Sequence, residues 1–350
     1  MTWNKKKDIF ALMVGHGTSL DGSWDPGCTY GSYTEAGLML PIVKTAAKWL
    51  RKSGVRVLTD ADAGNKRNMK SSVAWAERNG CKRYMSVHCD NRLNATTKSP
   101  SGIAPLYVSA AGKKMADTVG KSIAKSMGMK WLGSTRRTDL YELNATTMPS
   151  VILETGFIKA DLKKLKDYKK YGKALAKAIC KYLGVEIYVS RRTQLLRKMA
   201  FVIAYMNTHG FKYQVSGNAY SWKTARRKKT SNCATAASYA CQLAGALDDG
   251  QIFYINGRRV VCKGKGTKAK LLKNFTVKHP NKSPRSAKAK KGYITGYSKN
   301  PHTQMYAGMN KKNKPTWYSW GPSDVGDKQP KRKPSYDSKK IETMLIIREK

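Results

Sequence analysis

The sequence predicts an α/β fold for the first half of the chain, with a twisted, mostly parallel sheet flanked by helices, and an α+β fold for the second half. Strand-like and helix-like segments alternate up to Gly184, which is typical of strands joined by helical crossovers. Beyond residue 192, helix-like segments come first and strand-like segments follow. At 350 residues and 41% hydrophobic content, the chain is long enough for two domains, each with its own core.

In the first half, the apolar run from Ile9 to Val14 reads as a short buried strand. Residues 35–51 carry apolar side chains at helical spacing, and Pro41 is expected to kink this helix. The other predicted elements are a strand at 55–59, a helix at 67–80, a strand at 83–90, a helix at 112–128, a strand at 150–158 and a closing helix at 162–184.

The alternation stops after residue 184, and we place the domain boundary there. We expect one domain at 1–185, a linker at 186–192 and a second domain at 193–350. The second domain begins with an amphipathic helix at 194–210 and has another helix that starts near Asn232. Its predicted strands are 251–255, 258–262, 292–297, 303–308, 316–320 and 343–348.

The charge is strongly unbalanced, with 67 Lys and Arg against 22 Asp and Glu, a formal net charge of +45. Such a charge attracts polyanions: nucleic acid, anionic lipid surfaces, or bacterial wall polymers such as teichoic acids. The basic residues are spread through both halves and do not follow one recognition element, which argues against a specific nucleic-acid partner.

We find no signal peptide and no run of the roughly 18–20 apolar residues that a membrane span needs. The expected location is therefore the cytoplasm. Seven cysteines form no CxxC pair, and an odd number without an export signal suggests free thiols.

Four residues of the first half combine into a candidate site: His16, Glu35, His88 and Glu154. The histidines and Glu154 lie at or just beyond predicted strand ends, where open α/β sheets bind ligands. Two histidines and a carboxylate match a catalytic zinc site with one open position, and a second carboxylate could act as general base. Taken singly, each has an ordinary alternative, such as a surface histidine or a first-turn helix carboxylate.

Four segments carry a family resemblance: GHG, EAGLML, SVHCDN and PSVILETGFI. Over residues 8–184 the chain resembles the zinc-dependent N-acetylmuramoyl-L-alanine amidases of the Amidase_3 type. The resemblance implies that His16, Glu35 and His88 are zinc ligands and that Glu154 is the catalytic carboxylate. Cys89 departs from the small polar residue usual beside the last histidine, and strand alternation predicts that it faces away from the metal.

Cys233 is the second candidate centre. Ser231 and Asn232 are good helix N-caps, which places Cys233 in the first turn, where a thiolate is favoured. The alternative is that Cys233 is a small buried hydrophobe. Cys241, two turns further along, is expected in the core.

Over residues 193–350 the segments NCATAASYACQLAG and HTQMYAG are similar to the papain-like cell-wall peptidases of the NlpC and CHAP groups. This resemblance implies a papain-like domain in which Cys233 is the nucleophile and His302 the base. Ser319, or Asp324 just beyond it, stands where the third polar member is expected. Gly292 and Tyr293 replace the Gly-Asp pair that commonly precedes the histidine strand.

Two such sites on one basic chain predict a phage endolysin that waits in the host cytoplasm for a holin. It would cut the sugar–peptide amide of peptidoglycan and a bond of the stem peptide or cross-bridge. One alternative keeps the amidase but makes the second half a non-catalytic wall-binding module. Another is a basic nucleic-acid-binding protein. The aromatic residues available for stacking on sugars in a wall-binding module are Tyr220, Trp222, Trp317, Tyr318 and Trp320.

Overall fold

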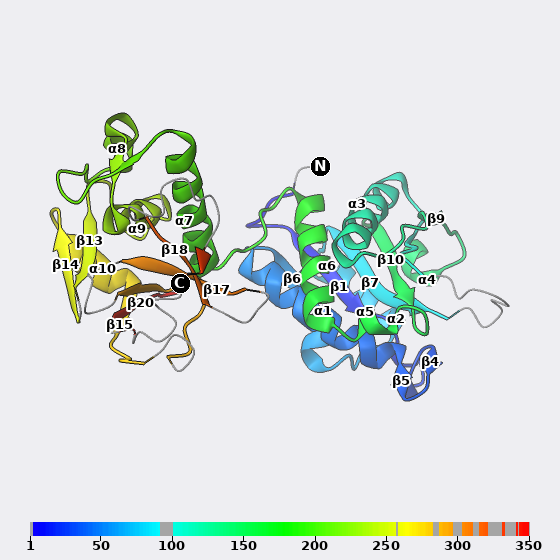
Figure 1. The fold of residues 1–350 in the computed structure, drawn as a ribbon. Helices are drawn as coiled ribbons and strands as arrows, with labels where there is room; N and C mark the ends of the chain where they lie inside the picture. The colour runs from blue at the N-terminus through cyan, green and yellow to red at the C-terminus, as the bar shows by residue number, and fades with distance from the viewer. Residues whose placement is uncertain are drawn as a thin grey trace. The chain divides into compact units, whose positions relative to one another are not determined.

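The computed structural model describes residues 3–91, 101–256, 258–282, 287–296, 303–310, 315–320, 331–332, 341 and 343–349. The chain divides into two compact units, Met1–Tyr188 and Val189–Lys350. In Figure 1 the first unit runs from blue to green and the second from green to red.

A six-stranded sheet lies at the centre of the first unit, in the order β6-β1-β7-β10-β8-β9. Its strands are β1 (Ile9–Val14), β6 (Arg56–Leu58), β7 (Arg83–Asp90), β8 (Leu106–Tyr107), β9 (Thr135–Arg136) and β10 (Ser150–Phe157). All neighbouring pairs are parallel except β10 with β8. This agrees with the predicted α/β fold and brings the carboxyl ends of β1, β7 and β10 to one edge.

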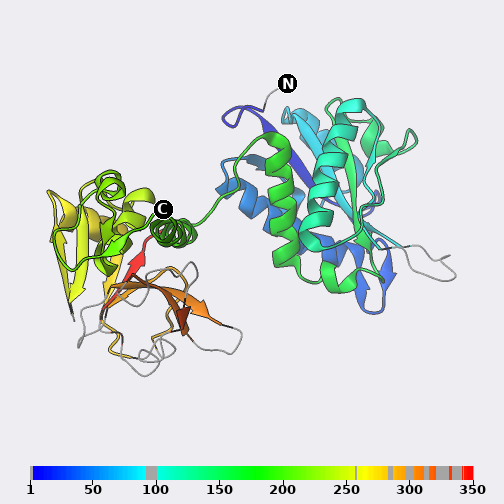
Figure 2. The ribbon, with the colours of Figure 1, turned by 45° about the horizontal axis from the view of Figure 1, so that its top comes forward.

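Helices cover both faces of this sheet. They are α1 (Glu35–Lys52), α2 (Met69–Arg78), α3 (Ala110–Met127), α4 (Tyr141–Asn144), α5 (Leu162–Leu165) and α6 (Tyr168–Leu183), with a 3₁₀ turn at Asp60–Ala63. Two small hairpins, β2 (Gly17–Thr18) with β3 (Trp24–Asp25) and β4 (Thr29–Tyr30) with β5 (Tyr33–Thr34), connect β1 to α1. Figures 1 and 2 show α1, α3 and α6 packed side by side on one face.

Strand alternation decides which side chains meet each layer of helices. Phe10 and Leu12 pack into the large core under α1, α3 and α6, whereas Ala11 and Met13 pack with α2 on the other face. On β7 the same alternation sends Cys89 into the large core. It therefore turns His88, the preceding residue, to the opposite face.

The structure bears on two helices of the prediction, the one that contains Pro41 and the closing one at 162–184. Helix α1 runs as one helix through Pro41. The single closing helix predicted at 162–184 is wrong, because α5 ends at Leu165 and α6 begins at Tyr168. Asp167 separates them, since its side chain accepts the backbone N–H of Lys170 and so caps a new helix.

The second unit is α+β, as the sequence predicts. Its helices are α7 (Arg191–Thr208), α8 (Trp222–Lys228), α9 (Cys233–Leu243) and α10 (Thr267–Asn274). A sheet of order β15-β20-β16-β17-β18-β19 packs with them, and its described pairs are all antiparallel. These strands are β15 (Phe275–Lys278), β16 (Ile294–Gly296), β17 (Gln304–Met309), β18 (Pro315–Tyr318), β19 (Lys331–Arg332) and β20 (Thr343–Ile347). Shorter pairs join β11 (Lys212–Tyr213) to β12 (Thr230–Ser231) and β13 (Ile252–Asn256) to β14 (Arg259–Lys263).

The aromatic residues expected to stack on sugars are mostly in the interior. Trp222, Trp317 and Trp320 are buried, and only Tyr220 among the five is well exposed. That part of the expectation is wrong for the three tryptophans, because rings that fill a core offer no face to a ligand.

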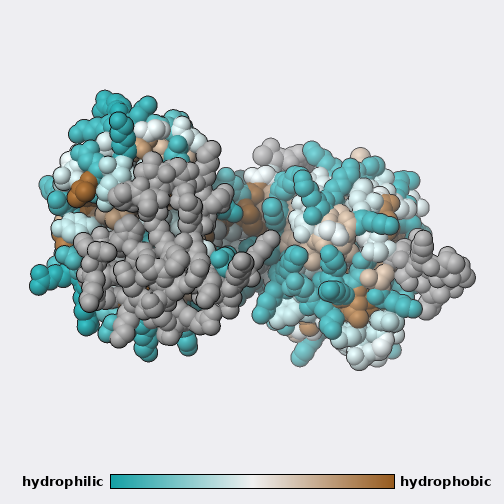
Figure 3. All heavy atoms as spheres, viewed as in Figure 1, coloured by the Kyte–Doolittle hydropathy of each residue, from teal (hydrophilic) through white to brown (hydrophobic). Residues whose placement is uncertain are grey.

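The surface gives two further findings. Within the described part of the chain, no helix is both long and apolar enough to span a bilayer. On the face drawn in Figure 3, hydrophilic residues are spread over the first unit.

Candidate functional site

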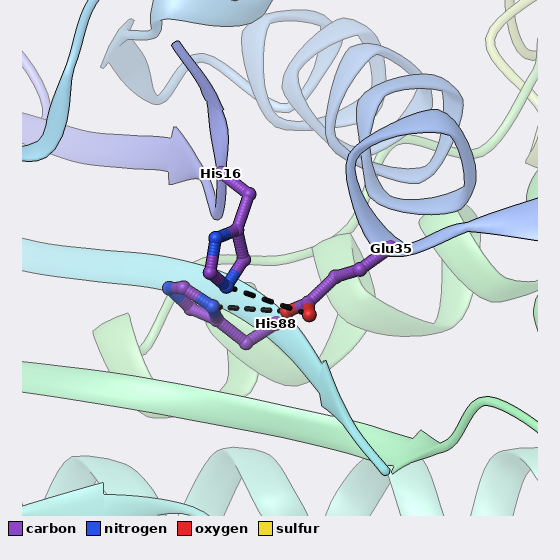
Figure 4. A group of neighbouring side chains, drawn as sticks. All are labelled: His16, Glu35 and His88. Atoms are coloured by element: carbon purple, nitrogen blue, oxygen red, sulfur yellow. Dashed lines mark hydrogen bonds and ion pairs between the residues drawn. The ribbon is translucent and has the colours of Figure 1, made fainter. Parts of the chain in front are cut away.

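His16, Glu35 and His88 converge at the carboxyl edge of the first sheet (Figure 4), and one donor atom from each lies within 4.8 Å of the others. The Nδ1 atom of His88 is 3.0 Å from Oε1 of Glu35. The Nε2 atom of His16 is 3.4 Å from Oε2 of the same carboxylate. The loop after β1, the first turn of α1 and the end of β7 thus supply one side chain each.

Local backbone structure orients His16. Its φ of 62° lies in the left-handed region, which a non-glycine residue seldom adopts. The Asn65 side chain donates to the His16 carbonyl and holds this turn. The hairpin of β2 and β3 then brings Asp25 within 2.8 Å of the His16 Nδ1 atom.

Glu35 is the first residue of α1, whose N-cap is Thr34. Its carboxylate is buried and accepts the backbone N–H groups of Cys28 at 3.1 Å and Cys89 at 3.0 Å. Burial alone would raise the pKa of Glu35, but the hydrogen bond from His88 and the charges of His88 and His16 lower it to about 2. Glu35 is therefore ionised across the physiological range.

His88 lies between two carboxylates. Its second ring nitrogen, Nε2, is 3.5 Å from Oε2 of Glu142 on α4. Burial alone would lower the pKa of His88, but Glu142 and Glu35 together raise it well above its usual value. Glu142 is itself buried and accepts hydrogen bonds from Tyr84 and Ser86 on β7.

Glycines make room for this cluster. A Cβ at Gly15 would lie 2.4 Å from atoms of the His88 ring. A Cβ at Gly27 would lie 2.7 Å from both Glu35 and His16. The backbone can approach the three side chains only because these two positions lack side chains.

Glu154 pairs with His88 across β10 and β7, in register. Its Oε2 atom is buried without a hydrogen-bond partner. Burial, reinforced by the nearby carboxylates of Glu35, Asp90 and Glu142, raises the pKa of Glu154 to about 8. An acid so perturbed beside a histidine pair is suited to proton transfer near neutral pH.

The residues present fit a divalent cation. Two imidazoles and one carboxylate are a donor set that zinc accepts, with a further position open to water or substrate. The buried carboxylates of Glu35 and Glu142 and the buried Oε2 atom of Glu154 call for positive charge nearby. The unpartnered Oε2 atom of Glu154 shows that the protein's own hydrogen bonds leave this cluster incomplete.

A cavity of about 270 Å³ opens beside the cluster. His16, His88, Asp25 and Glu142 line it, together with Arg67. A substrate could therefore reach the side of the cluster where both imidazole rings lie.

Cys28 and Cys89 lie next to Glu35, with their thiol groups close to each other. Their sulfur atoms are 3.9 Å apart, and together with a Glu35 oxygen they form a second group of three atoms that could hold a metal. Cys89 lies on the face of the strand opposite His88, as alternation predicts, but its backbone N–H holds Glu35. None of the seven cysteines, all of which the structure describes, forms a disulfide.

In the second unit, Cys233 is the first residue of α9, and Asn232 caps that helix with a capping box that involves Thr235. The Thr303 backbone N–H points at the Cys233 sulfur, 3.5 Å away. A cavity of about 440 Å³ includes Cys233, Thr303 and Asn218 in its wall. Cys241 is fully buried, as expected.

The rest of the predicted second site is less complete. His302 and Asp324 lie outside the described residues. Ser319 is buried just after β18.

Sequence reasoning missed two acids of the first site, Asp25 and Glu142. Asp25 precedes Pro26 and Gly27, a turn signal nine residues after His16 that could have suggested a return to the histidine. Glu142 sits in a one-turn helix, and no periodic pattern marks it.

The comparisons with known proteins concern the first unit. Residues 11–185 match the family model Amidase_3, whose description is N-acetylmuramoyl-L-alanine amidase. An uncharacterized 38.4 kDa protein of Clostridium perfringens is 28% identical over 154 residues, which are 42% of this chain and 45% of that protein. The chain thus spans less than half the length of this curated relative.

Among solved structures, the N-acetylmuramoyl-L-alanine amidase AmiC2 of Nostoc punctiforme is 26% identical, with a TM-score of 0.46. The match covers 51% of this chain and 98% of that one. An N-acetylmuramoyl-L-alanine amidase from Clostridium difficile 630 is 21% identical, with a TM-score of 0.45, over 51% of this chain and 97% of that one.

Proposed function

Because this chain belongs to the N-acetylmuramoyl-L-alanine amidase family that the Amidase_3 model describes, we propose that its first unit hydrolyses the amide bond between the muramic acid lactyl group and L-alanine in peptidoglycan. The observation that carries the proposal is the convergence of His16, Glu35 and His88 next to the unpartnered acid Glu154.

In the proposed mechanism, His16, Glu35 and His88 would hold a zinc ion. Zinc, when bound, supplies a Lewis acid that polarises the scissile carbonyl and lowers the pKa of water. Glu154 accepts the proton of the attacking water and passes it to the departing amine of L-alanine. The raised pKa of Glu154, about 8, suits a group that must both take up and release a proton near neutral pH.

The test uses purified peptidoglycan and the full chain. The parent should release free amino groups of L-alanine without new reducing sugar ends. Glu154→Gln should lower the rate of L-alanine amine release by about 10²–10⁴-fold, the usual contribution of a general acid–base group. Glu186→Gln, at an exposed position, is the matched control and should leave the rate unchanged. A parent that frees no L-alanine amine would refute the proposal.

A second activity is favoured by the geometry at Cys233. We propose that the second unit is a papain-like cysteine peptidase that cuts a bond of the stem peptide or cross-bridge. Cys233 is its nucleophile, His302 its base and Ser319 its third polar member. The support is that Cys233 opens α9 at the wall of a cavity and receives the Thr303 N–H.

Glu154→Gln isolates this activity, because it removes the amidase. We expect the single variant to release new amines from peptidoglycan, and Glu154→Gln/Cys233→Ala to release none. Cys262→Ser in the same background is the control thiol and should keep the activity. If Glu154→Gln releases no amines yet still binds walls, the second unit is a non-catalytic wall-binding module.

We further propose that the net charge of +45 holds the protein on anionic wall polymers. Binding to purified walls should weaken steeply between about 50 and 500 mM salt, because the Debye length is about 10 Å at 0.1 M. Walls stripped of teichoic acid are the control and should bind little at any salt. Equal binding to nucleic acid and to intact walls would favour the nucleic-acid alternative.

The biological role that these activities suggest is that of a phage endolysin, retained in the host cytoplasm until a holin opens the membrane. Expression in a sensitive host should leave cells intact until a holin is co-expressed. Lysis without a holin would overturn this role while leaving both enzymatic proposals standing.

A further inference from the structure

Each histidine of the metal cluster has a carboxylate oxygen within 3.5 Å of each of its two ring nitrogens. One nitrogen of each faces the Glu35 carboxylate: Nε2 of His16 and Nδ1 of His88. The other nitrogen of each faces a second carboxylate, Asp25 for His16 and Glu142 for His88. His16 lies in the loop after β1 and His88 lies on β7, so different segments of the chain build the same arrangement at the two histidines.

Asp25 is held in place by more than the histidine. Its Oδ2 atom is 2.8 Å from Nδ1 of His16, while its Oδ1 atom accepts the backbone N–H of Gly27 at 3.0 Å. The pairing of Gly17 with Asp25 between β2 and β3 fixes the distance between the two side chains. Because each oxygen has its own donor, the carboxylate cannot rotate away from His16 without losing a bond.

Glu142 is fixed in the same manner from the opposite side. Tyr84 donates to its Oε1 at 2.7 Å and Ser86 donates to its Oε2 at 3.1 Å. Tyr84, Ser86 and His88 alternate along β7 and therefore share one face. The strand that carries the histidine thus also orients the carboxylate behind it.

A histidine that binds a metal through one nitrogen must carry its proton on the other, and a carboxylate hydrogen-bonded to that other nitrogen fixes the choice. We propose that Asp25 and Glu142 are positioning residues that hold the protons of His16 on Nδ1 and of His88 on Nε2. The nitrogens that face Glu35 are thereby left free to bind the metal. This inference rests on the proposed metal site, and it assigns roles to two residues outside the ligand set.

The experiment measures zinc affinity of the full chain by competition with a chromophoric chelator. Asp25→Asn and Glu142→Gln should each weaken zinc binding by about 10–100-fold, the usual effect of losing such a partner. In Asp25→Asn, the Gly27 N–H and the His16 ring compete for one amide oxygen. Asp21→Asn is the matched control, because Asp21 lies in the same loop and its carboxylate accepts hydrogen bonds from Ser23.

Three further measurements separate positioning from a loss of folding. Far-UV circular dichroism should be unchanged in the variants. Tyr84→Phe, which leaves the Glu142 carboxylate in place but removes one of its donors, should weaken zinc binding by less than Glu142→Gln does. Long-range ¹H–¹⁵N spectra of the zinc-loaded parent should show His16 protonated at Nδ1 and His88 at Nε2.

Folded variants that bind zinc as tightly as the parent, or spectra with the opposite tautomers, would overturn the inference and leave the amidase proposal intact. A parent chain that binds no zinc would instead refute the metal site itself, and the inference with it.

Discussion

Asp60 is a buried acid close to the metal cluster but outside it. Its carboxylate accepts the backbone N–H of Val14 at 3.0 Å and the Ser72 hydroxyl at 3.0 Å. Burial, which outweighs these hydrogen bonds, raises the pKa of Asp60 to about 6. The folded protein therefore binds a proton on Asp60 more tightly than the unfolded chain does, and ionisation of this group opposes folding.

This shift predicts a pH-dependent effect of Asp60→Asn. Below pH 4 the acid is protonated in both states and costs nothing, whereas above pH 6 it is charged in both and the full penalty applies. At 1.36 kcal/mol per pKa unit, the penalty is about 3 kcal/mol at most. Relative to the parent, the variant should gain unfolding free energy as pH rises from 4 to 6, measured by urea denaturation. A difference that stays constant with pH would contradict the shift.

Gly15 offers a steric test of the metal cluster. A Cβ at this position would lie 2.4 Å from the His88 ring, so Gly15→Ala must displace the ring. We expect zinc affinity to fall by at least tenfold. Gly22→Ala is the control: it has open space but a φ of 88°, so it should cost stability without changing zinc affinity. Equal zinc affinities of Gly15→Ala and Gly22→Ala would show that the His88 ring can move without loss of metal binding.

The sequence indicated His16, Glu35, His88 and Glu154 because each lies at or next to the end of a predicted strand or the start of a predicted helix. In a parallel sheet the carboxyl ends of neighbouring strands meet at one edge. His88 and Glu154 face each other in register, as strands β7 and β10 require. The sequence did not indicate Asp25 or Glu142 as site residues, because Asp25 lies on a two-residue strand and Glu142 on a one-turn helix. Elements so short carry no periodicity, and only tertiary contacts determine where they lie.

Among the elements, strand β7 shows what local sequence can predict. Its bounds, Arg83–Asp90, are those that the apolar run indicates. Helices α8 and α10 and strand β15 were not predicted, since all three are short and the two helices are rich in lysine and arginine. Segments this short give little hydrophobic pattern, and strand β15 pairs with β20, which is distant in the sequence.

The contact between α1 and α6 gives a prediction at this scale. A Cβ on Gly172 would lie 2.5 Å from the Thr45 Cβ and 2.6 Å from the Ile42 carbonyl oxygen. Alanine favours a helix over glycine by about 1 kcal/mol, but a backbone oxygen cannot yield to the clash. Gly172→Ala should therefore destabilise the first unit, by about 1–3 kcal/mol in urea unfolding.

Adding Thr45→Ala to this variant should restore little of the loss, because the Ile42 carbonyl remains in the way. Full recovery in the double variant would show instead that the Thr45 side chain alone limits the approach of the two helices.

At the scale of the whole molecule, each unit has a hydrophobic core of its own, and the proposed metal ligands all belong to the first. Calorimetry should therefore resolve two unfolding transitions. Zinc at 100 times its Kd stabilises the folded state that binds it by about 2.7 kcal/mol. For a unit of this size that is a rise of about 5–10 °C in one transition, with the other unmoved. His16→Ala should abolish the rise. Zinc that moved both transitions equally would mean that the two units unfold as one, or that the second unit also binds the metal.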